Sequence, residues 1–159
     1  MQQHLERIYR DHRQGLFTLA LSITGCPDLA EDAVHDAVVR LWRSEKKPGG
    51  DPVAYVFASV RNAALDQMRR RKPPAAAVSV FDSEWSDPVL AAQSGEQGQL
   101  VRRAVEALPP DQRQTVVLRI HAGLTFRQIA ETLGEPLQTV ASRYRRALER
   151  IKETIEGSI

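Results

Sequence analysis

The spacing of the apolar residues constrains the fold of this chain more than any other feature of its sequence. Near the N-terminus, the residues that recur at steps of three and four are Leu5, Ile8, Tyr9, His12, Leu16, Leu19 and Ile23. A helix returns to the same face about every 3.6 residues, so this spacing predicts an amphipathic helix. Further helical stretches follow up to residue 72 and again over 100–156. We therefore expect an all-α fold.

Proline and glycine mark where these helices end or begin, at Gly25, Pro27, Pro52, Pro73, Pro74, Pro109, Pro110, Gly123 and Gly134. After the first helix, the helices expected between these breaks span residues 28–42, 52–72, 100–108, 111–122, 125–133 and 136–155. Asp28, with Glu31 three residues later, predicts a capping-box-like start for the second helix. Asp111 and Thr125 are expected to cap two of the later helices.

Residues 73–99 show no sustained apolar period and carry four acidic but no basic side chains. We expect a flexible acidic linker over 74–99, joining two small helical domains at 1–73 and 100–159. Phe81 and Trp85 are the large aromatic residues in this segment, and the sequence assigns them no role.

The charge of the chain is unevenly distributed. Residues 1–72 and 100–159 each carry a net charge of +3 and residues 73–99 carry −4, which gives the total of +2. Two basic blocks suit a polyanionic partner. The N-terminus lacks the apolar core of a signal peptide, and no apolar run approaches the roughly 20 residues needed to span a bilayer. These features predict a cytoplasmic protein without membrane insertion.

Few residues of this chain suit catalysis. The four histidines are dispersed, and the sequence holds no metal-spaced cluster, phosphate-binding loop or serine nucleophile motif. We therefore expect no enzymatic activity, no cofactor and no metal. The lone Cys26 cannot form an internal disulfide, which suits a reducing compartment, and we expect it to be a small buried residue.

The last two predicted helices have the order of a helix-turn-helix: a short helix, a glycine turn and a longer basic helix. On the last helix, the residues expected in the core are Val140, Tyr144, Ala147, Leu148, Ile151 and Ile155, packed on Ile129, Leu133, Val117 and Leu118. The opposite side carries the candidate DNA contacts Gln138, Ser142, Arg145 and Arg146, flanked by Thr139 and Arg143. Arginine and glutamine can bind base edges, whereas serine and threonine suit phosphates. The alternative is that these arginines only solvate a surface helix.

Residues 108–153 resemble the fourth conserved region of the sigma-70 family of RNA polymerase sigma factors. The matching residues are Leu108-Pro109, Arg113, Gly123-Leu124-Thr125, Ile129-Ala130, Leu133-Gly134, Thr139-Val140, Ser142-Arg143 and Arg146-Ala147. The chain departs from the family pattern at Glu135, Pro136 and Ala141, where apolar, serine and lysine residues are common. The resemblance implies that the last helix binds the upstream (−35) promoter element.

Residues 28–42 resemble the second conserved region of the same family, with matches at Ala30-Glu31-Asp32, Val34, Asp36, Arg40 and Trp42. In that family this helix docks on the clamp helices of the largest polymerase subunit. The resemblance gives the candidate core-polymerase contacts Asp32, His35, Asp36, Val39 and Arg40. For Val39 the alternative is an exposed valine with no partner.

The next segment carries further matches to that region at Ala54-Tyr55-Val56-Phe57, Arg61-Asn62, Leu65-Asp66 and the basic run that follows. The family uses this helix and the preceding loop to bind the opened strand of the downstream (−10) element. The candidate contacts are Lys46, Lys47, Tyr55, Arg61, Asn62, Arg69, Arg70 and Arg71. For Phe57, packing in the core is the favoured alternative.

Together these matches identify the chain as a member of the extracytoplasmic-function (ECF) group of sigma factors. Membership implies a promoter-specificity subunit whose partners are core RNA polymerase, through its clamp helices and flap region, promoter DNA and an anti-sigma factor. A conventional helix-turn-helix regulator remains the alternative, with residues 1–73 as a dimerisation or sensing domain. A protein-binding adaptor that never contacts DNA is a third interpretation.

Overall fold

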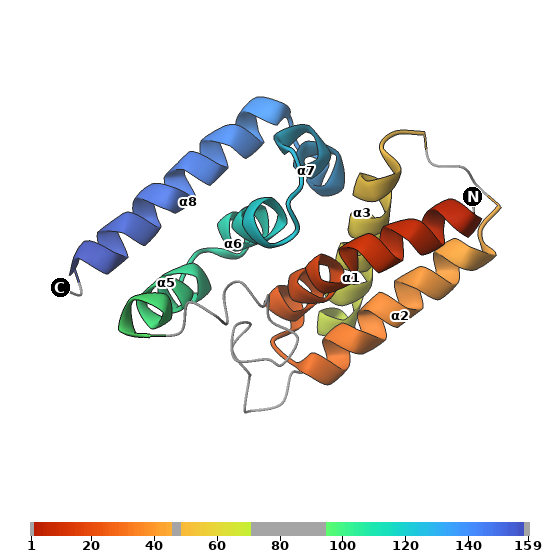
Figure 1. The fold of residues 1–159 in the computed structure, drawn as a ribbon, viewed down its shortest axis with the longest axis horizontal. Helices are drawn as coiled ribbons and strands as arrows, with labels where there is room; N and C mark the ends of the chain where they lie inside the picture. The colour runs from red at the N-terminus through yellow and green to blue at the C-terminus, as the bar shows by residue number, and fades with distance from the viewer. Residues whose placement is uncertain (1, 46–48, 71–94, 158–159) are drawn as a thin grey trace.

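The structure, a computed structural model, describes residues 2–45, 49–70 and 95–157. Every regular element within these residues is a helix (Figure 1), which confirms the predicted all-α fold. The helices are α1 (Gln2–Thr24), α2 (Pro27–Arg43), α3 (Pro52–Arg70), α5 (Glu96–Glu106), α6 (Pro110–Val116), the π-helix η1 (Val117–His121), α7 (Phe126–Leu133) and α8 (Leu137–Gly157). No helix of the described part of the chain is both long and apolar enough to cross a membrane.

Most of the predicted linker, with Phe81 and Trp85, lies outside the described residues. Its C-terminal end differs from the prediction, because α5 begins at Glu96 rather than at residue 100. The first turn of α5 contains only polar residues and glycine, so no apolar residue reveals the helical period there.

Helices α1, α2 and α3 form one packed bundle in which each helix contacts the other two (Figure 1). The α1 stripe predicted from the sequence supplies Leu16 and Leu19, both fully buried. Phe57 of α3 is also fully buried, as expected for a core residue. Burying such side chains stabilises the bundle by roughly 1.5–3 kcal/mol each.

The start of α2 differs from the predicted capping box. Cys26 occupies the N-cap position without a side-chain hydrogen bond, and Pro27 takes the first turn. Proline suits that position because its fixed φ angle is helical and it lacks the N–H that would stay unpaired. Asp28 therefore lies inside the first turn, where it can still interact with the helix dipole. Cys26 is half-buried rather than buried.

Asp51 caps α3, a role that the sequence reading did not assign. Its Oδ1 accepts hydrogen bonds from the backbone N–H groups of Val53 and Ala54, at 2.8 and 3.2 Å. Asp111 does not occupy the N-cap position of α6, which Pro109 takes, but its Oδ1 accepts a hydrogen bond of 2.9 Å from the backbone N–H of Gln112 in the first turn. The reason is again a proline in the first turn, which starts the helix before the acidic residue.

The helix-turn-helix forms as predicted. The Thr125 side chain and Gln128 make a reciprocal capping box that begins α7, and Gly134 ends α7 in the left-handed conformation at φ 66°. Val140 and Ala147 of α8 are fully buried together with Ile129. The predicted core stripe is wrong at one position, since Leu148 is 40% exposed.

The two helical domains pack against each other (Figure 1). Helix α3 contacts α7, and α1 contacts both α6 and η1. A Cβ atom added to Gly15 of α1 would lie 3.0 Å from the Cα and Cβ atoms of Ala122, which shows how closely the domains approach. Their buried apolar residues form one continuous core.

Candidate nucleic-acid interface

The exposed face of α8 brings together most of the residues predicted to contact the upstream element. Gln138, Arg145 and Arg146 are exposed, and Ser142 is half-buried. Because residues three and four apart lie on the same helix face, Gln138, Ser142 and Arg145 form one stripe. Thr139 is half-buried at its flank. This stripe has the donors and length that a major-groove helix requires.

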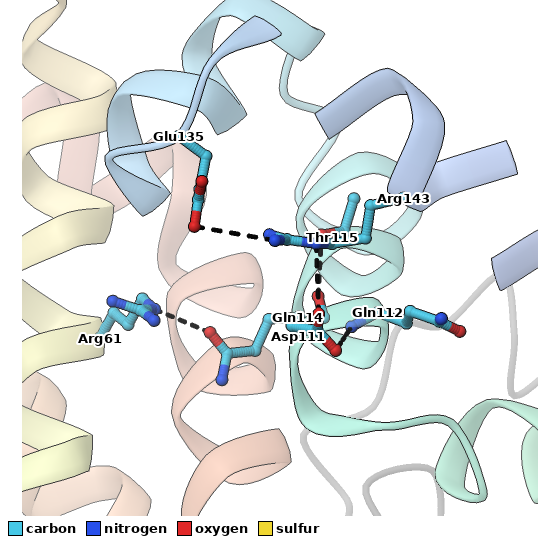
Figure 2. Close-up of polar contacts among 7 residues, drawn as sticks. All are labelled: Arg61, Asp111, Gln112, Gln114, Thr115, Glu135 and Arg143. Atoms are coloured by element: carbon cyan, nitrogen blue, oxygen red, sulfur yellow. Dashed lines mark hydrogen bonds and ion pairs between the residues drawn. The ribbon is translucent and has the colours of Figure 1, made fainter. Parts of the chain in front are cut away.

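Arg143 lies apart from this stripe. Its side chain is only 15% exposed, and its guanidinium contacts the Asp111 carboxylate at 3.3 Å and the Glu135 carboxylate at 3.7 Å (Figure 2). Both partners come from other elements, the first turn of α6 and the turn before α8. The structure therefore holds Arg143 toward the interior side of the helix-turn-helix rather than toward solvent.

Helix α3 presents a second stripe. Tyr55 is 38% exposed, and Asn62 and Arg69 are exposed at successive steps of seven residues. Seven residues make nearly two turns, so these three side chains share one face. Arg70 is also exposed, whereas Lys46, Lys47 and Arg71 lie outside the described residues. The stripe combines an aromatic ring with cations, the combination that binds unstacked bases and their phosphates.

Arg61, another candidate contact on α3, lies outside this stripe and points toward the other domain. Its Nε donates a hydrogen bond of 2.7 Å to Oε1 of Gln114 in α6 (Figure 2). Burial lowers the pKa of the Arg61 guanidinium below its usual value, the Arg143 charge lowers it further, and Glu135 raises it. The group remains a cation, because arginine keeps its proton in proteins. The lowered pKa means that the charged form of Arg61 is less favourable in this partly buried position than in water.

The outer face of α2 carries the residues predicted to contact core polymerase. Asp32, His35, Asp36 and Arg40 are exposed, and Val39 is half-buried. Beside this face, Tyr9, Arg13 and Phe17 of α1 line an open groove with Asp32, His35 and other α2 residues, and the sequence did not predict this groove.

Comparisons with known proteins agree with this arrangement. Residues 8–73 match the family model described as Sigma-70 region 2, and residues 98–151 match the one described as Sigma-70, region 4. The ECF RNA polymerase sigma-E factor of Escherichia coli (strain K12) is 30% identical over 142 residues, which cover 80% of this chain and 74% of that protein. The chain belongs to the ECF sigma factors of the sigma-70 family.

The chain spans between half and three fifths of the length of two further ECF relatives. It is 29% identical over 159 residues to the ECF sigma factor SigE of Mycolicibacterium smegmatis, covering 96% of the chain but 59% of that relative. It is 32% identical over 159 residues to SigJ of Mycobacterium tuberculosis, covering 91% of the chain and 50% of that relative.

Two solved structures superpose on nearly the whole of this chain. The sigma factor RpoE, in complex with the anti-sigma factor NepR from Bartonella quintana, has a TM-score of 0.67 at 23% identity and covers 97% of this chain and 95% of its own. CnrH, in complex with the cytosolic domain of CnrY, has a TM-score of 0.70 at 20% identity and covers 100% and 92%. These likenesses concern the fold, including both helical domains.

Proposed function

We propose that this ECF sigma factor is a promoter-specificity subunit of RNA polymerase whose two domains bind different parts of the promoter. The observation that carries the proposal is the order of the two matched regions. A region 2 match covers the helices with the α2 and α3 faces, and a region 4 match covers the helix-turn-helix. A conventional regulator needs the second match but gives no reason for the first, and we do not favour it.

The domain formed by α5 to α8 binds the upstream element as duplex DNA. Gln138, Arg145 and Arg146 contact base edges or phosphates from the major groove, and Ser142 and Thr139 contact phosphates. Because a neutralised phosphate releases counterions, each such arginine also makes binding dependent on salt.

The domain formed by α1 to α3 captures the opened strand of the downstream element. Stacking of a base on Tyr55 offsets part of the cost of unpairing it, and Asn62, Arg69 and Arg70 hold the adjoining backbone. Lys46, Lys47 and Arg71, which lie outside the described residues, are further candidate contacts to this strand. Strand opening then needs no covalent chemistry, and we propose that the chain has no catalytic activity.

The outer face of α2 binds the clamp helices of core polymerase, and the second domain meets its flap region. Asp32 and Asp36 provide negative charge, and Val39 lies between charged neighbours, a composition that suits a protein interface with an apolar centre. We also propose an anti-sigma partner and action in the bacterial cytoplasm. Supporting evidence for that partner is that the structural relative RpoE was solved with the anti-sigma factor NepR.

Two sets of charge variants test this division of labour. Asp32→Lys/Asp36→Lys is expected to abolish core-polymerase binding while duplex binding stays intact, and Glu6→Lys on α1 serves as the exposed-charge control. Arg145→Ala/Arg146→Ala is expected to do the opposite. Loss of both activities in either variant, with the fold intact by circular dichroism, would refute the division.

A further inference from the structure

Arg143 joins α8, the second helix of the helix-turn-helix, to two neighbouring elements of the same domain. Its Nε lies 3.3 Å from Oδ2 of Asp111 in α6, and its Nη2 lies 3.7 Å from Oε1 of Glu135 (Figure 2). Asp111 belongs to the first turn of α6, and Glu135 belongs to the turn between α7 and α8. The Arg143 side chain therefore bridges the second turn of α8 to both of these elements.

Both partners of Arg143 are themselves held in place. Oδ1 of Asp111 accepts a hydrogen bond of 2.9 Å from the backbone N–H of Gln112, so the other oxygen of the carboxylate meets Arg143. Glu135 follows Gly134, which ends α7 in the left-handed conformation, and its own backbone N–H donates to a carbonyl oxygen of α7 at 3.0 Å. Because both ends of the bridge are anchored, the bridge restricts the movement of α8 relative to α6 and α7.

An aromatic contact holds the opposite flank of α8. The rings of Phe126 and Tyr144 meet edge to face with their centroids 5.3 Å apart, and the Arg119 guanidinium lies 4.7 Å from the Phe126 centroid. On a helix, Arg143 and Tyr144 fall on either side of the buried stripe that contains Val140. Apolar packing is non-directional, so the contacts on the two flanks fix how far α8 is rotated about this stripe.

We propose that Arg143 is a positioning residue for promoter recognition, which sets the orientation of α8 by bridging Asp111 and Glu135 and acts on the upstream element without contacting it. The proposal rests on the proposed function, because the orientation of α8 matters only if α8 reads that element. Bidentate hydrogen bonds to base edges require a fixed direction, whereas attraction to the phosphates does not depend on sequence. Loss of the bridge should therefore lower discrimination between sequences more than it lowers attraction to DNA.

Arginine suits this bridge, and lysine does not. The planar guanidinium offers separate N–H groups to two carboxylates, whereas the single ammonium group of lysine keeps the charge but cannot span both partners. A phosphate contact would be different, because lysine also binds phosphates. The effect of Arg143→Lys therefore separates a bridge within the protein from a contact with DNA. Glu135 is also a departure from the sigma pattern described above, so this half of the bridge is not part of that pattern.

Discrimination is measured by transcription with holoenzyme assembled from the full chain and purified bacterial core polymerase. Two templates compete in one reaction. One carries a promoter that this protein selects from a fragment library of the source genome, and the other carries the same promoter with its upstream element scrambled. Arg143→Ala should lower the ratio of the two transcripts about tenfold, within the range for the loss of one bidentate base contact. Arg143→Lys should lower it nearly as much.

A variant of the two carboxylates tests the same bridge from its other side. Asp111→Asn/Glu135→Gln keeps the size of both side chains but removes their charge, and it should lower the transcript ratio several-fold although neither residue is assigned to DNA. Adding Arg143→Ala should lower the ratio no further than Arg143→Ala alone, because the bridge is then already lost. The matched control is Glu153→Gln/Glu156→Gln, which removes two exposed charges near the other end of α8 and should leave the ratio unchanged.

A variant of similar stability separates positioning from a general loss of stability. Ile8→Val shortens a buried side chain of α1 and should lower the melting temperature by about 2–4 °C, as Arg143→Ala should. Because Ile8 lies in the other domain, this variant should leave the transcript ratio unchanged. All variants are compared at a temperature at which circular dichroism shows each of them to be folded.

Several results would overturn the proposal. A ratio that Arg143→Lys retains and Arg143→Ala loses would mean that the arginine contacts a phosphate directly. An unchanged or higher ratio for Asp111→Asn/Glu135→Gln would mean that the bridge does not position α8, and an equal fall for Ile8→Val would mean that only stability matters. If the unaltered protein directs transcription from no fragment, the proposed function is wrong and the proposal fails with it. A promoter that all variants discriminate equally well refutes the positioning role alone.

Discussion

Alanine substitutions of three α8 arginines, made one at a time, should have two different effects. Two of them should weaken DNA binding, and the third should lower stability. Arg145 and Arg146 are exposed, whereas Arg143 is 15% exposed and contacts two carboxylates. Exposed substitutions usually change the free energy of unfolding by no more than about 0.5 kcal/mol. Arg145→Ala and Arg146→Ala should therefore leave stability unchanged, yet each should weaken binding to a promoter duplex by about 1–3 kcal/mol, which is roughly 5- to 150-fold.

Arg143→Ala should behave differently because its contacts lie within the protein. The partner carboxylates are 58% and 39% exposed, so each ion pair is worth only about 0.2–1 kcal/mol. Removing both should lower the free energy of unfolding by about 1 kcal/mol, partly offset by the loss of repulsion with Arg61. For a chain of this size we expect the melting temperature to fall by about 2–4 °C.

The assays are thermal unfolding by circular dichroism and fluorescence anisotropy with a fluorescent promoter duplex, for all three variants. The reasoning would be refuted if Arg145→Ala destabilised the protein as much as Arg143→Ala. It would also be refuted if Arg145→Ala and Arg146→Ala both bound DNA as tightly as the unaltered protein.

Further substitutions at four positions probe other parts of the structure. Tyr55→Ala should weaken binding of a single-stranded oligonucleotide by about 1–3 kcal/mol without unfolding the protein. Phe57 is fully buried, so Phe57→Ala should instead lower the free energy of unfolding, measured by urea titration, by about 3–5 kcal/mol. Thr125→Ala removes the α7 cap and should cost about 1 kcal/mol, and Thr125→Ser should retain most of it; equal losses would argue against the cap. Arg113→Ala removes guanidinium hydrogen bonds of 3.1 and 3.2 Å to two carbonyl oxygens, one in each domain. The free energy of unfolding should fall by roughly 1.5–3 kcal/mol, as expected for a charged hydrogen bond. A fall below about 0.5 kcal/mol would contradict that role.

The positions of the helices could be predicted because their signals are local. Apolar spacing and the prolines and glycines between helices act over a few residues, and Thr125 could be assigned as a cap because it directly precedes a short helix that Gly134 ends. The same rule failed at Asp28, where Pro27 competes for the first turn. Apolar spacing failed to predict the start of α5, because the first turn of that helix carries no apolar residue to mark the helical period.

The arrangement of the candidate site could be predicted only in part. The exposed stripe of α8 follows from helix geometry, since Gln138, Ser142 and Arg145 are spaced to share a face. The contact between Arg61 and Gln114 joins residues 53 positions apart, and no local pattern specifies it. The ion pairs of Arg143 with Asp111 and Glu135 likewise depend on how α6 and α8 pack, so a helical wheel could place Arg143 only at the flank.

Transcription by purified bacterial core polymerase on a fragment library of the source genome, with and without this protein, tests the central claim most directly. We predict new, discrete start sites that appear only with the protein and share two spaced upstream sequence elements. The absence of new start sites, together with failure to bind core polymerase, would contradict a role as a promoter-specificity subunit.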